Sequence, residues 1–281
     1  MQTRTLGRTG AELSIVGFGG IVVMNESAED AARIVKTAID RGVTYFDVAP
    51  SYGNAEQMLG PALEPYRDGV FLACKTGKRT ADEARAELEG SLERLRTDHF
   101  DLYQFHGVTK MEDAETILAP GGALETAVAA REAGTVKHLG FSAHSEDAAL
   151  ALMAGFEFDS VLFPVNIFCW HHGNFGRRIL EDAKRRGMGA LALKSLAHKP
   201  WAEGEKRTWK KCWYRPLDEA RAVSMALRFT LSKGVTAAVC PSHEELLWLA
   251  CDAADAYEPL TDEEERAALA DLDGAPIFKS E

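Results

Sequence analysis

The chain has 281 residues, 46% hydrophobic and 27% charged, which is enough to bury a large core in one or two globular units. Its formal net charge of -11 argues against a nucleic-acid backbone or an anionic membrane as partner, since either favours an excess of Lys and Arg. Five cysteines without a C-x-x-C pair indicate neither a disulfide framework nor a zinc site. Together with a polar N-terminus and no apolar run near the ~18 residues of a membrane span, they predict a cytoplasmic protein.

Short apolar runs and segments of helical spacing alternate along the chain. A hairpin with a glycine-containing turn is predicted over residues 3–13. The apolar runs predict eight strands, near residues 14, 44, 70, 100, 137, 160, 189 and 235. The helical segments cover residues 28–42, 54–67, 81–98, 122–134, 145–155, 175–186, 216–234 and 243–257. Ser27 or Glu26 is expected to cap the first helix, and four helices are expected to end at glycines, namely Gly42, Gly134, Gly187 and Gly234.

Eight strand–helix alternations, with strands apolar on both faces, predict a (β/α)8 TIM barrel preceded by the short hairpin. We expect one domain over residues 1–281. The alternative, an open doubly wound sheet, is less favoured because Val22 stands where the third glycine of a G-x-G-x-x-G turn would fall. Two long connections, residues 106–120 and 197–215, would leave the carboxyl ends of strands, where barrels place their active sites. The second is rich in aromatic residues and would form a substrate wall or a packing cover.

Polar side chains stand at the predicted ends of three neighbouring strands. Asp47 ends the second strand with Tyr52 in the loop after it, Lys75 ends the third strand, and His106 ends the fourth. Each of these residues taken singly has an ordinary structural explanation, as a cap, a packing residue or a solvated charge. Because the strands of a parallel barrel end at one rim, we expect the four to lie together as a strand-end cluster. Cys74 should face the other way, into the core.

The strand-end cluster suits proton transfer to an oxygen. A tyrosine is a poor acid at neutral pH because its free pKa is about 10. A nearby ammonium stabilises the phenolate, and a carboxylate keeps that ammonium charged and oriented. Tyr52 beside Lys75 and Asp47 is therefore expected to protonate a developing alkoxide, while His106 hydrogen-bonds the same oxygen.

Four stretches of the chain resemble one known family, the aldo-keto reductases. They are F-D-V-A-P-S-Y-G at residues 46–53, A-C-K-T-G at 73–77, D-L-Y-Q-F-H-G at 101–107 and A-G-T-V-K-H-L-G-F-S at 133–142. The resemblance covers nearly the whole chain. It implies NAD(P)H-dependent reduction of an aldehyde or ketone to an alcohol, with Tyr52 as general acid assisted by Lys75, Asp47 and His106. The cofactor, NADP with NAD as the alternative, would lie across the barrel mouth without a Rossmann fold.

The resemblance also implies cofactor contacts at particular positions: Gly20, Ile21, Asp47, Ser142, Asn166, Lys194, Ser195, Leu196 and Ser242. Three neighbouring positions depart from the family pattern. Ala143 replaces an asparagine, Leu162 replaces a glutamine, and Leu193 replaces a tyrosine that would stack on the nicotinamide. We therefore expect the grip on the carboxamide and the stacking on the ring to be altered.

The eighth strand bears on the choice between NADP and NAD. Where the family carries an arginine for the 2′-phosphate, the chain reads V-C-P-S-H-E-E over residues 239–245, with two acids and no Lys or Arg nearby in sequence. Carboxylates repel a 2′-phosphate and accept hydrogen bonds from a 2′-hydroxyl, so NAD stays open beside NADP. Lys194 or a loop lysine would have to supply the missing charge.

Other functions also stay open at this point. The altered contacts would suit a nicotinamide-binding sensor or regulatory subunit with little turnover. Lys75 could serve a Schiff-base aldolase, although Asp47 would hold it protonated. The adjacent pair His171 and His172 would project in different directions, so no metal site is expected. The partner is expected to be a small carbonyl compound, and the sequence does not decide between a monomer and a homo-oligomer.

Overall fold

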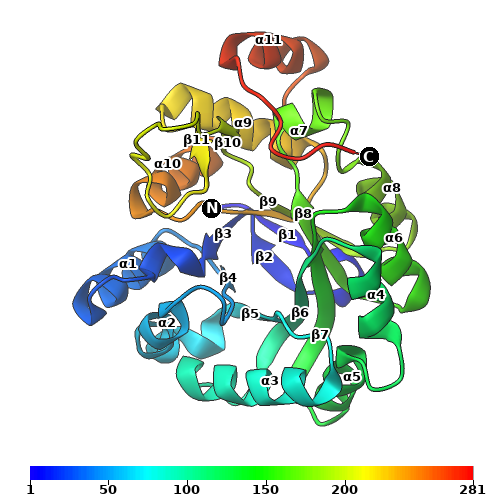
Figure 1. Ribbon diagram of the computed structural model, residues 1–281. Coiled ribbons are helices and arrows are strands. Elements are labelled where there is room, and N and C mark those ends of the chain that lie inside the picture. The colour runs from blue at the N-terminus through cyan, green and yellow to red at the C-terminus, as the bar shows by residue number, and fades with distance from the viewer. Residues whose placement is uncertain (281) are drawn as a thin grey trace.

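A computed structural model describes residues 1–280, and its centre is a closed barrel of eight parallel strands (Figure 1). The strands follow one another around the barrel in chain order, and the last pairs with the first. This confirms the predicted fold class. The strands are β3 (Val16–Gly19), β4 (Tyr45–Asp47), β5 (Phe71–Thr76), β6 (Phe100–Val108), β7 (Val136–Ala143), β8 (Ser160–Pro164), β9 (Gly189–Leu193) and β12 (Ala237–Val239).

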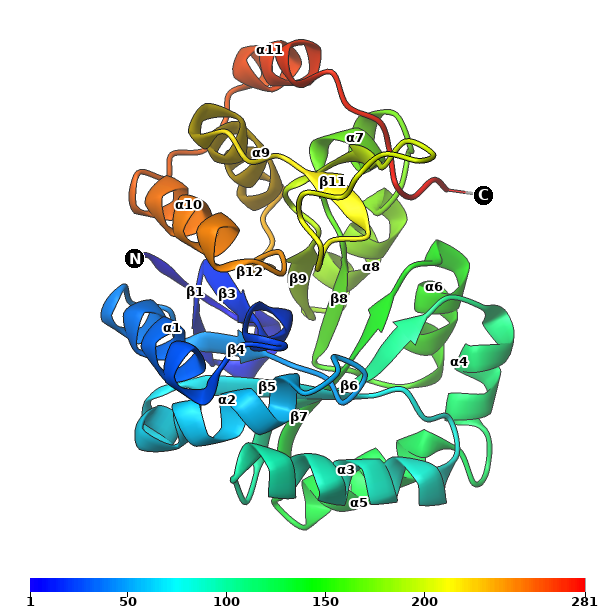
Figure 2. The ribbon, with the colours of Figure 1, turned by 60° about the vertical axis from the view of Figure 1, so that its left-hand side comes forward.

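Helices surround the barrel (Figure 2). Eight of them lie within the predicted segments: α1 (Ala28–Asp40), α2 (Ala55–Leu63), α3 (Ala81–Leu95), α5 (Ala123–Glu132), α6 (Glu146–Gly155), α8 (Arg177–Arg185), α9 (Ala220–Ser232) and α10 (Glu244–Asp255). Ser27 caps α1 by accepting a hydrogen bond from the Asp30 N–H at 3.0 Å, as expected. The four glycines expected at helix ends all have positive φ, between 66° and 81°.

Several short elements were not predicted. Three further helices are α4 (Met111–Leu118), α7 (Ile167–His171) and α11 (Asp262–Leu272). Three 3-10 helices are η1 (Gly7–Thr9), η2 (Gly20–Val23) and η3 (Glu64–Gly69). The long connection after β9 contains an antiparallel pair, β10 (Ala197–Pro200) and β11 (Tyr214–Pro216). No helix within residues 1–280 is long and apolar enough to cross a membrane.

The predicted N-terminal hairpin is present as β1 (Thr3–Thr5) and β2 (Glu12–Ser14), paired antiparallel. Its residues Leu6 and Leu13 are fully buried and pack with the side chains that fill the barrel, including Tyr45, Leu102 and Leu191. Burying each aliphatic side chain stabilises the fold by about 1.5 to 3 kcal/mol. The hairpin thus closes the barrel at the end opposite to the active-site rim.

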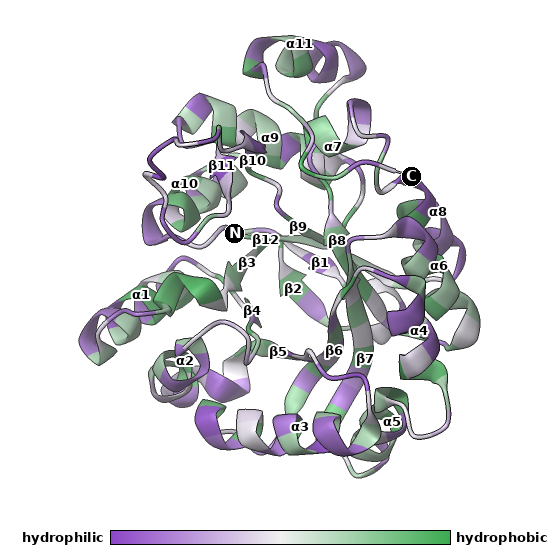
Figure 3. Cartoon of the chain, viewed as in Figure 1, coloured by the Kyte–Doolittle hydropathy of each residue, from purple (hydrophilic) through white to green (hydrophobic). Residues whose placement is uncertain are grey.

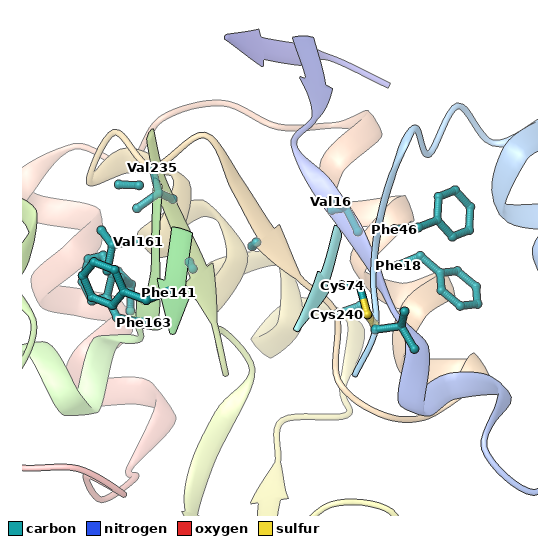
Figure 4. Packing of buried hydrophobic residues seen from close by; sticks show 14 of the residues in the cluster. Val16, Phe18, Phe46, Cys74, Phe141, Val161, Phe163, Val235 and Cys240 are labelled. Atoms are coloured by element: carbon teal, nitrogen blue, oxygen red, sulfur yellow. The ribbon is translucent and has the colours of Figure 1, made fainter. Parts of the chain in front are cut away.

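A second, larger core lies between the strands and the helices. Alternation along each strand sends every other side chain into this layer, where the Phe18 and Phe46 rings stack with centroids 4.9 Å apart (Figure 4). Cys74 and Cys240 lie in the same layer. In Figure 3 hydrophobic residues run along the barrel strands while the outer helices carry many hydrophilic ones. The barrel is therefore rigidly packed on both faces, and its strand ends are fixed in position.

Candidate active site

Alternation along the strands places the strand-end cluster inside the barrel mouth. Tyr45 fills the barrel interior, so Asp47 two residues later faces the same side one layer higher. Ala73 and Lys75 repeat this relation on β5. His106 lies on β6, which continues to Val108, so the expectation that this strand ends at His106 was short by two residues.

Asp47 and Lys75 form a buried ion pair, with Lys75 Nζ in contact with Asp47 Oδ1. The same carboxylate accepts hydrogen bonds from the Tyr45 hydroxyl at 3.1 Å and from Gln104 Nε2 at 2.9 Å. Lys75 Nζ also donates to the Val48 carbonyl oxygen at 3.3 Å. Burial alone lowers the pKa of Lys75, but Asp47 outweighs it and raises that pKa above its ordinary value. The lysine is therefore charged and fixed.

Tyr45 and Gln104 were not identified from the sequence as part of the site. Both lie at inward positions, and Gln104 stands two residues before His106 within the D-L-Y-Q-F-H-G motif. Their two donors, with Lys75, satisfy a carboxylate that burial would otherwise destabilise. The alternation of inward and outward side chains along the strands could have identified these two residues.

The Tyr52 hydroxyl lies 3.4 Å from His106 Nε2, and the two rings meet edge to face at 5.4 Å. Lys75 Nζ is 5.2 Å from the centre of the Tyr52 ring. Burial raises the pKa of Tyr52, Lys75 lowers it and Asp47 raises it, with a net rise above the ordinary value. The lowering by Lys75, which the sequence predicts, is thus outweighed by burial and Asp47. In the free protein Tyr52 therefore keeps its proton at neutral pH.

His106 is held from both sides. Its Nδ1 lies 3.2 Å from the Ser51 hydroxyl, and its backbone carbonyl accepts a hydrogen bond from Arg79 at 2.8 Å. Burial, together with the positive charges of Lys75, Lys194 and Arg79, lowers the pKa of His106 to about 3. The imidazole is therefore neutral and can donate a hydrogen bond through one nitrogen while it accepts through the other.

A cavity of about 130 Å³ opens beside the cluster. Asp47 and Tyr52 line it, as do Ile21, Lys194 and Ser242 from the expected cofactor contacts. Leu162 and Leu193, the two replacements noted above, also face it. The remaining lining residues are Gly19, Lys211, Cys212, Trp213, Tyr214, Val239, Cys240 and Pro241. The cavity thus combines apolar walls with a few polar groups at one end, which is typical of ligand sites.

The other expected cofactor residues do not line this cavity. Ser142 is buried, and its Oγ accepts a hydrogen bond from the Gly107 N–H at 2.7 Å. Asn166 caps α7 by accepting from the Cys169 N–H at 2.9 Å. Gly20 begins η2, and Ser195 and Leu196 are buried at the end of β9. The amide oxygen of Asn166 is thus already used within the protein.

The aromatic connection crosses the cavity mouth. Lys211 Nζ binds Glu26 at 2.6 Å and the Val22 carbonyl oxygen at 2.8 Å, on the far side of the cavity. Trp213 lines the cavity and is 50% exposed, whereas the Trp209 indole donates to Asp218 at 2.8 Å. The connection therefore serves both as a wall and as a cover. A cavity of this size is small for a dinucleotide.

The sequence predicts acids without a basic partner in the region after β12, and the structure shows a partner for one of them. Arg33, from α1, binds both carboxylate oxygens of Glu244 at 2.6 and 2.9 Å. This bidentate pair lowers the pKa of Glu244 and neutralises its charge. The expectation that no basic residue lies nearby holds only along the sequence, because the barrel brings α1 next to α10.

Two other residues considered in the sequence, His171 and Cys74, make contacts that indicate structural roles. His171 Nε2, on α7, lies 2.8 Å from Glu265 of the C-terminal helix α11. This contact joins the two helices. Cys74 is fully buried and its thiol lies 3.5 Å from Glu56, so burial holds its pKa well above the ordinary value. The expected orientation of Cys74 away from Lys75 is thus confirmed.

The fold and the site together define a class: (β/α)8 barrels with an acid–base cluster at the carboxyl ends of their strands. Within that class, the chain belongs to the aldo/keto reductase family, whose model matches residues 16–264. This confirms the family resemblance found in the sequence motifs.

Individual relatives agree with this placement. The chain is 31% identical over 190 residues to the aldo-keto reductase YhdN of Bacillus subtilis, a match that covers 60% of the chain and 55% of YhdN. It is 29% identical over 218 residues to a 6-dehydroglucose reductase of Novosphingobium aromaticivorans, covering 69% and 68%. The matches to the first curated relatives span about half of their length or less. The holo form of aldo-keto reductase AKR11C1 from Bacillus halodurans shares the fold, with a TM-score of 0.76, 23% identity and coverage of 99% and 98%.

The neutral state of His106 gives a direct prediction. Because its pKa lies near 3, nitrogen NMR of the imidazole should show one protonated and one unprotonated nitrogen from pH 8 down to about pH 5. The His106→Gln variant, which lacks the signal, assigns it. A doubly protonated ring at pH 6 would contradict the electrostatic account of the site.

Proposed function

We propose that the protein reduces an aldehyde or ketone to an alcohol with a reduced nicotinamide cofactor, and that residues 1–281 form one barrel domain for this purpose. The observation that carries the proposal is the protonated Tyr52 hydroxyl, which faces the cavity beside the buried Lys75–Asp47 pair. Family membership supports the same activity.

The cavity suits the cofactor on its own chemistry. Ile21, Leu162, Leu193 and Val239 offer apolar surface to a flat nicotinamide ring. Ser242 stands just before the N-terminus of α10, where backbone N–H groups attract phosphate. The backbone of residues 194–196, with Gly20, Ser142 and Asn166 around the cavity, would complete the contacts. A bound reduced nicotinamide supplies the hydride.

The strand-end cluster then handles the proton. The substrate carbonyl oxygen would lie between the Tyr52 hydroxyl and His106 Nε2, which are 3.4 Å apart without it. Tyr52 donates its proton to this oxygen as negative charge develops there. Lys75 stabilises the resulting phenolate, and Asp47 keeps Lys75 charged and in place. A Ser51 hydroxyl that donates to His106 Nδ1 leaves the imidazole proton on Nε2, directed at the substrate oxygen.

NADP is the cofactor we favour, with NAD as the alternative. The acids after β12 would repel a 2′-phosphate, but Arg33 neutralises Glu244. Arg33, which reaches from α1 to the start of α10, also retains donors that a phosphate could use. The region therefore tolerates a 2′-phosphate better than its sequence indicates.

A second candidate is a nicotinamide-binding sensor with little turnover. The observation that favours it is the exposure of Leu162 and Leu193 to the cavity, because neither side chain can hold the carboxamide by hydrogen bonds. Carbonyl reduction remains our choice because the proton-transfer groups are all present and ordered around Tyr52.

Replacing the proposed acid tests the function. Tyr52→Phe should lower kcat with NADPH and a reactive aldehyde by at least about 100-fold, because general acid catalysis contributes that much or more. Tyr66→Phe, in η3 outside the cavity, should leave the rate unchanged. Full activity of Tyr52→Phe would reject Tyr52 as the acid. NADPH binding by the wild-type protein, without turnover on a broad carbonyl panel, would support the sensor.

Replacing Arg33 tests the cofactor choice. Fluorescence titration of the wild-type protein should show tighter binding of NADPH than of NADH. Arg33→Met should reduce that preference by about tenfold, since it restores the charge of Glu244 beside the 2′-phosphate. Lys36→Met, on the same helix with an exposed partner in Asp40, should not. Tighter binding of NADH by the wild-type protein would assign NAD instead.

A further inference from the structure

The side chain of Lys194 spans the barrel mouth from the end of β9 to the end of β7. The residue follows β9 in a left-handed conformation with φ of 61°, which is unfavourable for a non-glycine residue. Its Nζ lies 2.8 Å from Nε2 of His144, which follows β7. The ammonium thus reaches past the end of β8 toward the strands that carry the strand-end cluster.

Two aromatic rings also lie near the side-chain nitrogen of Lys194. Nζ lies 5.3 Å from the ring centre of Phe278 and 5.8 Å from that of Trp213. Phe278 also stacks on His144, with centroids 4.8 Å apart. The C-terminal segment that supplies Phe278 runs from α11 past α7, as the red trace in Figure 2 shows, and the Ser280 N–H donates a hydrogen bond of 2.8 Å to the Gly173 carbonyl oxygen.

Lys194 has no compensating negative charge in the part of the chain that the structure describes. None of its carboxylates lies within the 4.0 Å ion-pair distance of Lys194 Nζ. By contrast, Lys75 has Asp47, and Lys211, also in the cavity lining, has Glu26. Burial without a partner lowers the pKa of Lys194 to about 7, so a bound carboxylate would favour its charged form. A perturbed group of this kind in a cavity is a candidate for ligand binding.

We propose that Lys194, supported by His144, binds a carboxylate of the substrate, so that the preferred substrates are aldehydes or ketones that carry a carboxylate group. Lys194 lines the same cavity as Tyr52, which brings the two ends of one small molecule into reach of both residues. The inference rests on the proposed carbonyl reduction and specifies its substrate class.

The position of the ammonium favours a substrate carboxylate over a cofactor phosphate as the anion. Its charge acts on both His106 and His144, which places it on the proton-transfer side of the cavity. The start of α10 at Ser242, where we expect phosphate, is supplied by β12 instead. Phe278 and Trp213 lie beside Nζ and supply no negative charge that would compete with a bound anion.

Matched substrates test the proposal. The wild-type protein should show a higher kcat/KM for 4-formylbenzoate and succinate semialdehyde than for their methyl esters, which keep the aldehyde but lack the charge. Lys194→Met should lower this acid-to-ester ratio by about tenfold or more, the size expected for a hydrogen bond to a charged group. Lys194→Arg should restore part of the ratio. Lys210→Met, with the same change of charge at an exposed loop position, should leave the ratio as in the wild type.

A binding measurement separates this proposal from the proposed function. Calorimetric titration with benzoate, which cannot be reduced, should detect binding to the wild-type protein and at least about tenfold weaker binding to a folded Lys194→Met variant. Benzoate binding without turnover of any carbonyl compound would support the anion site while rejecting carbonyl reduction. An unchanged acid-to-ester ratio in Lys194→Met would overturn the proposal. A loss of NADPH affinity in Lys194→Met with the ratio unchanged would also overturn it and assign the anion as a cofactor phosphate.

Discussion

The buried ion pair between Lys75 and Asp47 is the interaction on which the rest of the site depends. Removing two charges from water costs several kcal/mol per ion, and their attraction offsets this only when the remaining hydrogen-bonding capacity is filled. Tyr45 and Gln104 fill it on the carboxylate side. The pair therefore places a permanent positive charge below Tyr52, and that charge also helps to keep His106 neutral. Beside the larger effect of burial, the pair thus acts on the pKa values of both groups that would contact the substrate oxygen.

The barrel makes this arrangement possible because it fixes the strand ends from two sides. Leu6 and Leu13 of the N-terminal hairpin close the opposite end, and the layer that contains Phe18 and Phe46 holds the strands against the helices. Side chains on adjacent strands, such as Asp47 and Lys75, are then held within contact distance without support from flexible loops. The covering connection, by contrast, supplies Trp213, which lines the cavity, and the C-terminal segment supplies Phe278, whose ring lies 5.3 Å from Lys194 Nζ.

Much of the fold could be predicted from periodicity, because strand and helix patterns alternate eight times. The strand-end cluster could be predicted as well, since Asp47, Lys75 and His106 follow directly from where apolar runs end. Contacts between distant segments could not: nothing in the sequence links Arg33 to Glu244 or Phe278 to His144. The short helix α7 was missed because it forms only five residues, capped by an Asn166 that the family pattern had reserved for the cofactor. The first kind of miss comes from tertiary contacts that local patterns do not encode, and the second from the shortness of the element.

We expect Lys75 to act on Tyr52 only while Asp47 keeps the Lys75 ammonium charged. Single-turnover rates of carbonyl reduction, measured by rapid mixing with saturating NADPH, test it in Lys75→Met, Asp47→Leu and the double variant. If the two residues act as a unit, the double variant should be no slower than Lys75→Met alone, because Asp47 has no ammonium left to hold. Rate losses that multiply in the double variant would contradict the account.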